Sequence, residues 1–201
     1  MANWLFKPFE RISGEVALTL GLVGIVLTAL VARLGGLQTD GVLDLHFAED
    51  MPLWKLLVQG LLNWLVLAGM LLVTGRWLSS SRFRVIDLLG TQAAARWPML
   101  LAAGYLAIPA IGNRISQLSA RMMEQMPAEP GQVTADLAHL LEAMWLTLLS
   151  LPILLSLAWM VWLMYHGYAR VCRISGMRAV FSFIGVLIAA EIITSGLAIL
   201  I

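Results

Sequence analysis

Four stretches of this chain are long and apolar enough to cross a lipid bilayer as helices, and this feature constrains the fold most. A helix needs about 20 apolar residues to cross a hydrocarbon core of about 30 Å. The stretches cover residues 16–34, 53–74, 144–164 and 180–201. Only 12% of the residues are charged, which is about half the usual share in a soluble domain. The pattern predicts an all-α integral membrane protein.

A fifth apolar segment, residues 98–112, is short for a crossing, and it reads either as a span or as a re-entrant loop. Nine of the thirteen Lys and Arg residues lie before the first stretch, after the second or after the fourth. Five crossings place these three regions on one side, as the positive-inside rule requires. We therefore predict one domain, residues 1–201, that forms a five-helix transmembrane bundle with its N-terminus in the cytoplasm and its C-terminus outside.

Short amphipathic segments are expected at the membrane surface between these crossings. Residues 3–14, 83–98 and 113–126 combine apolar side chains with basic ones, a pattern typical of interfacial helices. In the second of these segments, Arg96 is expected to extend to the lipid headgroups. From residue 132, the chain runs without a break into the fourth stretch, which predicts a long helix that projects from the outer surface.

The last apolar stretch contains one carboxylate, Glu191. An isolated charge inside a membrane costs a few kcal/mol, so we expect it to face other helices. The predicted polar cluster consists of Glu191, Thr194, Ser195, Gln59 and Asn63. We favour Glu191 as a neutral hydrogen-bond donor that joins the last helix to the second. The alternative is a proton or substrate site in a small transporter or channel.

The first outer loop is acidic and holds three weak candidates for metal ligands, Asp40, Asp44 and His46. Carboxylates and an imidazole can bind a divalent cation. The spacing matches neither a calcium-binding loop nor a structural zinc pattern, so a solvated acidic loop is the favoured interpretation. We expect no cofactor and no catalytic activity, because the sequence contains none of the familiar catalytic motifs.

Four arginines in the predicted inner loops are candidates for contact with anionic lipid headgroups. They are Arg82, Arg84, Arg173 and Arg178. Setting the topology is the favoured role for these residues. Nucleic acid is not an expected partner, because the basic residues are scattered over connecting loops. Small residues at four-residue spacing, such as Ala17 and Gly21, predict close contact between helices.

Several segments resemble bacterial members of the Yip family, membrane proteins named for their interaction with Ypt/Rab GTPases. They are "NWLFKPFERISG", "DGVLDLHF", "VIDLLGTQAAARWPMLLAAG" and "ARVCRISGMRAVFSFIGVLIAAEIIT". The resemblance implies five membrane spans and no catalytic residues. Eukaryotic members form complexes with relatives and act in vesicle traffic. For this chain, the resemblance implies a scaffold or adaptor in a bacterial inner membrane that binds lipids, other membrane proteins or further copies of itself.

Overall fold

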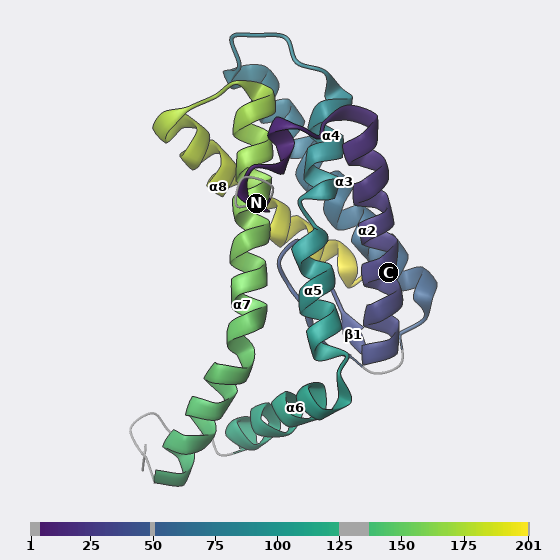
Figure 1. Ribbon diagram of the computed structural model, residues 1–201, viewed down its shortest axis with the longest axis vertical. Helices are drawn as coiled ribbons and strands as arrows, with labels where there is room; N and C mark the ends of the chain where they lie inside the picture. The colour runs from purple at the N-terminus through teal and green to yellow at the C-terminus, as the bar shows by residue number, and fades with distance from the viewer. Residues whose placement is uncertain (1–4, 49–50, 125–136, 201) are drawn as a thin grey trace.

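The computed structural model describes residues 5–48, 51–124 and 137–200, and almost all of this part is helical. The predicted all-α bundle is confirmed (Figure 1). A short 3-10 helix and a two-stranded hairpin accompany the α-helices. The elements are η1 (Pro8–Glu10), α2 (Gly14–Gly35), β1 (Leu37–Gln38), β2 (His46–Phe47), α3 (Leu53–Leu78), α4 (Val85–Ala94), α5 (Trp97–Leu106), α6 (Pro109–Glu124), α7 (Leu137–Cys172) and α8 (Gly176–Ala198).

Four helices are long and apolar enough to cross a membrane, as expected of an integral membrane protein. They are α2, α3, the part of α7 from Leu140 to Cys172, and α8. A fifth candidate is the segment Val85–Leu106, which is followed after a bend of 85° by α6. Each of the four apolar stretches seen in the sequence therefore corresponds to one long helix.

The third crossing differs from the prediction. The helix does not run through residues 98–112, because α5 ends at Leu106 and α6 begins at Pro109 in a new direction. Proline lacks an N–H and disfavours helix at the preceding residue, which explains the end of α5. Residues 83–98 do not form a surface helix either, since Leu88, Gly90 and Gln92 of α4 are buried.

Helices α2 and α4 approach each other closely at Gly21. A Cβ atom on Gly21 would lie 2.3 Å from Cβ of Ala93 and 2.4 Å from its backbone carbonyl carbon. Such distances are far below van der Waals contact, so only glycine fits there. The predicted contact through small residues is thus present at Gly21, whereas a Cβ atom on Gly185 of α8 would meet nothing within 4 Å.

We predict that Gly21→Ala lowers the free energy of unfolding by about 1–3 kcal/mol, the usual cost of overfilling a packed contact. Thermal unfolding in detergent measures the effect. Gly185→Ala is the matched control and is expected to leave stability unchanged within about 0.5 kcal/mol. Equal effects of the two substitutions would contradict the close approach of α2 and α4.

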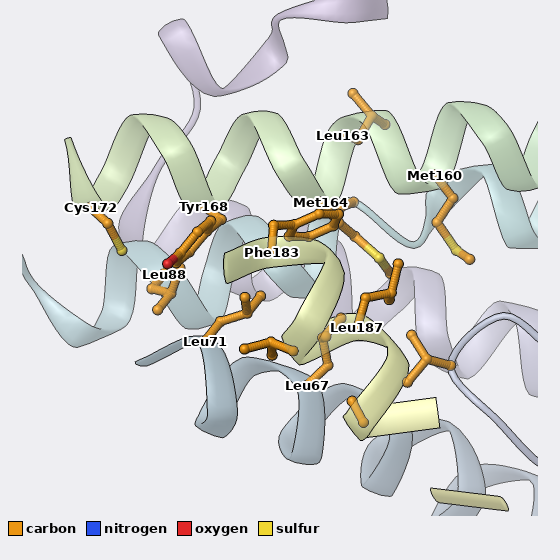
Figure 2. Close-up of a cluster of buried hydrophobic side chains, with 14 of the residues drawn as sticks. Leu67, Leu71, Leu88, Met160, Leu163, Met164, Tyr168, Cys172, Phe183 and Leu187 are labelled. Carbon is orange, nitrogen blue, oxygen red and sulfur yellow. The ribbon is translucent and has the colours of Figure 1, made fainter. Parts of the chain in front are cut away.

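The main apolar core joins α3, α4, α7 and α8. Figure 2 shows that the labelled side chains of these helices, except Leu163, converge on one region. They are Leu67, Leu71, Leu88, Met160, Met164, Tyr168, Cys172, Phe183 and Leu187. Tyr168 is fully buried, and its hydroxyl lies 3.1 Å from Oγ of Ser182. This core fixes the second half of α7 and the first half of α8 against the rest of the bundle.

The longest helix, α7, is the least covered of the four. Only 11% of its most apolar stretch is buried, compared with 28–39% in α2, α3 and α8. Its first turns leave the bundle and lie beside α6 at one end of the molecule (Figure 1), whereas the hydroxyl of Tyr105 on α5 still donates to the backbone oxygen of Leu149 over 3.0 Å. Nη1 of Arg121 on α6 donates to Oε1 of Glu142 on α7 over 3.4 Å. The predicted amphipathic helix after the third crossing is therefore present, and it packs on the long helix.

Candidate functional site

The loop between β1 and β2 is folded into the helix bundle rather than exposed to solvent. Gly41 and Val42 at its tip are buried, and Val42 belongs to the main apolar core. A Cβ atom on Gly41 would meet the carboxylate of Glu191, so a larger residue here would displace that carboxylate. We call residues 39–43 the inserted loop.

Two amide side chains of α3 hold the inserted loop. Nδ2 of Asn63 donates to the backbone oxygens of Gly41 over 2.7 Å and Thr39 over 3.2 Å. One turn away, Nε2 of Gln59 donates to Oδ1 of Asp40 over 3.2 Å. The side chains of Gln59 and Asn63 are each only 2% exposed. Buried backbone carbonyls need such donors, since an unpaired one costs free energy.

Glu191 holds the same loop from α8. Its Oε2 accepts a hydrogen bond from the backbone N–H of Leu43 over 3.0 Å. The carboxylate therefore acts as an acceptor, and the donor role expected from the sequence is not observed. Glu191, Gln59 and Asn63 gather around the inserted loop, and the loop, not a direct contact, connects α3 with Glu191.

The two hydroxyls expected beside Glu191 do not bind its carboxylate. Oγ1 of Thr194 is buried and donates to the backbone oxygen of Ala190 over 2.8 Å and to that of Glu191 over 3.2 Å. This is local bonding within one helix turn. Ser195 is half-buried, and the structure gives its side chain no bond to the cluster among the described residues.

Arg96 was not predicted from the sequence to join Glu191, Gln59 and Asn63; together with the inserted loop, we call these four residues the polar centre. Arg96 lies between α4 and α5, is only 6% exposed, and interacts electrostatically with Glu191. It does not extend to the headgroups as predicted. The signal was available: an acid inside a membrane needs a counter-charge, and Arg96 is the one basic residue between Val85 and Leu106.

A small cavity of about 30 Å³ adjoins Arg96, with room for about two water molecules. Residues of α2, α3 and α5 line it together with Thr28 and Thr39. Nε and Nη2 of Arg96 have no hydrogen-bond partner in the described part of the chain, and neither does Oε1 of Gln59. The space suits water that solvates the guanidinium, and it is far below the volume of a typical ligand pocket, about 300–1,000 Å³.

The three weak metal candidates lie together where the inserted loop returns to β2. Nδ1 of His46 is 3.1 Å from Oδ2 of Asp44, and its Nε2 is 3.5 Å from Oδ2 of Asp40. One ligand atom from each residue lies within 4.8 Å of the other two. The solvated acidic loop favoured from the sequence is only partly observed, because Asp40 bonds to the buried Gln59.

The four candidate arginines lie at two helix connections on the opposite end of the bundle. All are exposed: Arg82 and Arg84 precede α4, and Arg173 and Arg178 flank the turn from α7 to α8. Arg173 has a φ of 53°, the left-handed conformation that ends α7. Arg170, Arg173 and Ser175 line an open hollow of about 540 Å³ at this turn.

Comparison of the chain with protein-family models, with curated proteins and with solved structures finds no match. The assignment of function therefore depends on the geometry itself. Asn63 and Glu191 bond to the backbone of the inserted loop, Gln59 bonds to the side chain of Asp40, and the cavity beside Arg96 is small. Such a centre is suited to joining α3, α4, α5 and α8 through the loop.

Proposed function

We propose that the chain is a non-enzymatic scaffold or adaptor of the Yip-like type in a bacterial inner membrane, with five crossings, a cytoplasmic N-terminus and an external C-terminus. The binding surface in this proposal is the outer arm, which comprises α6 and residues 137–143 of α7. Its partners are other membrane proteins, further copies of the chain, or lipids.

The length and exposure of α7 carry this proposal. The helix has 36 residues, and a rise of about 1.5 Å per residue gives a length of about 54 Å. A hydrocarbon core is about 30 Å thick, so an upright α7 extends well beyond it. Large apolar side chains nevertheless remain exposed on the first turns of the helix, before the predicted crossing at residues 144–164: Leu137, Leu140 and Leu141. Exposed apolar patches outside lipid are typical of protein contact sites.

The polar centre supports a structural role for Glu191 over a transport role. Its carboxylate is engaged by Leu43 and Arg96, and the adjoining cavity holds little more than water. On the inner side, the exposed arginines favour attachment to anionic lipids, at about 1 kcal/mol for each residue near the surface. These contacts orient the bundle, while the outer arm selects the partner.

We predict that a photo-crosslinking amino acid at Leu141 forms discrete adducts with protein in intact membranes. The same amino acid at Val23 of α2 serves as control, since both side chains are 46% exposed and apolar. Val23 is expected to yield lipid adducts alone. Gel electrophoresis with mass spectrometry distinguishes these products. Lipid adducts alone at both positions would contradict the proposed role of the outer arm.

A small transporter or channel that uses Glu191 is the second candidate. A chain of polar groups favours it: Asp44, His46, Asp40 and Gln59 follow one another at 3.1–3.5 Å from the outer loop inward. The chain ends at Gln59, whose Oε1 is unpaired among the described residues, and Arg96, which has unpaired donors, lines the water-sized cavity. Ion flux through reconstituted protein separates the two candidates.

A further inference from the structure

We propose that Asp40 and His46 bind a divalent transition-metal ion at the outer face, with Asp44 orienting the histidine. The site is independent of the outer arm, but it shares Asp40, Asp44 and His46 with the polar chain of the transport candidate. Its ligands come from the hairpin that carries the inserted loop, so a bound metal would also hold the inserted loop in place.

The histidine ring has a carboxylate oxygen at each nitrogen. A neutral imidazole has one N–H donor and one lone pair, so one of its nitrogens faces a carboxylate without a proton between them. The 3.1 Å contact from Nδ1 to Asp44 is a normal hydrogen bond, whereas the 3.5 Å separation of Nε2 from Asp40 is too long for a good one. In the neutral ring, the shorter contact assigns the N–H to Nδ1 and leaves the lone pair of Nε2 towards Asp40. Either a second proton on the ring or a cation between Nε2 and Oδ2 offsets their repulsion, and metal titration distinguishes the two.

The separation of these two atoms fits a metal ion. Zinc binds imidazole nitrogen and carboxylate oxygen at about 2.0–2.2 Å with tetrahedral angles, which places adjacent ligand atoms about 3.4 Å apart. Nε2 of His46 and Oδ2 of Asp40 are 3.5 Å apart. The contact from Asp44 to the other ring nitrogen is the usual arrangement of a metal-binding histidine, because it fixes the tautomer and the ring orientation.

Gln59 gives a second, independent indication of a cation. It is 2% exposed, its amide reaches Asp40 over 3.2 Å, and its Oε1 has no partner among the described residues. Nε2 of Gln38 also donates to Oδ1 of Asp40, so Oδ2 stays turned towards His46. A half-turn of the Gln59 amide would present the unpaired oxygen to a bound ion, and the two orientations of an amide are isosteric.

The site is open to the outer side. Asp44 and His46 line a hollow of about 640 Å³ between the hairpin, α6 and α7, which leaves space for water or an external group to complete the coordination. An imidazole with carboxylates favours zinc, cobalt, nickel or copper over magnesium or calcium. The expected ligand class is therefore a divalent transition metal.

Titration of the full-length, EDTA-treated protein in detergent with Zn²⁺, followed by isothermal calorimetry, tests the site. We expect one ion per chain in the wild type, loss of binding in Asp40→Asn and His46→Ala, and affinity lowered about 10–100-fold in Asp44→Asn. His166→Ala is the control and should bind as the wild type does.

Circular dichroism and size-exclusion chromatography establish that each variant is folded, and His46→Gln replaces His46→Ala if the latter is not. Absence of Zn²⁺ binding by the wild type overturns the proposal. Binding that persists unchanged in both Asp40→Asn and the His46 variant overturns it as well, because the ion then lies elsewhere.

Discussion

Glu191→Ala is expected to lower the free energy of unfolding by about 1–3 kcal/mol, the usual cost of leaving a polar group inside the protein without its partner. The substitution leaves Arg96 inside the bundle without its counter-charge, and it leaves the N–H of Leu43 without an acceptor. Glu191→Gln is expected to cost less, because its amide oxygen still accepts from Leu43. Unfolding in detergent, followed by circular dichroism, measures both effects.

Two further variants test the cause of this loss. Glu142→Ala removes a partner of the exposed Arg121–Glu142 ion pair and should cost at most about 1 kcal/mol. Adding Arg96→Met to Glu191→Ala should recover part of the stability, because the uncompensated charge is then gone. Glu191 and Arg96 are not coupled if Glu191→Ala lowers the free energy of unfolding no more than Glu142→Ala does. They are also not coupled if adding Arg96→Met lowers the free energy of unfolding further by its full separate effect.

Asn63→Asp is expected to destabilise the protein by about 3 kcal/mol, since each buried group left unpaired costs about 1–3 kcal/mol. The two side chains have nearly the same shape, but the aspartate puts an acceptor oxygen in place of the amide that donates to Thr39 and Gly41. The inserted loop should then leave the bundle. Loss of stability and labelling of a cysteine at position 42, where Val42 is fully buried, report the change.

Asn113→Asp on the exposed surface of α6 is the matched control for this substitution. It makes the same chemical change without a buried partner and should leave stability within about 0.5 kcal/mol of the wild type. Equal stability of the Asn63 and Asn113 variants, with position 42 protected in both, would show that Asn63 does not hold the loop.

The long helices could be predicted from the sequence because burial in lipid demands continuous apolar stretches, and each of the four stretches became one helix. The third crossing could not be placed correctly. Its first half carries Gly90, Thr91 and Gln92, which look like surface residues, although they pack against neighbouring helices. The predicted position of Arg96 at the headgroups was wrong for the same reason. A charged residue usually indicates the membrane surface, unless a counter-charge from another helix accompanies it.

The members of the polar centre were predictable in part, but their arrangement was not. Helical spacing put Gln59 and Asn63 on one face, and Glu191 had to face inward. What joins them is the inserted loop, whose hydrogen bonds link Gly41 to Asn63 across 22 positions of sequence and Leu43 to Glu191 across 148. Local patterns carry no information on such distant pairing. Likewise, the proximity of Asp40, Asp44 and His46 followed from their spacing, whereas the contact of a carboxylate with each ring nitrogen did not.

The central claim is that Glu191 holds the inserted loop and does not carry ions. Proton flux into liposomes that contain purified wild-type protein or Glu191→Gln tests it most directly, with protein-free liposomes as the baseline. The structural role predicts that neither protein raises the flux above this baseline. Proton flux through the wild type that disappears in a folded Glu191→Gln protein would contradict the claim and identify the chain as a transporter or channel.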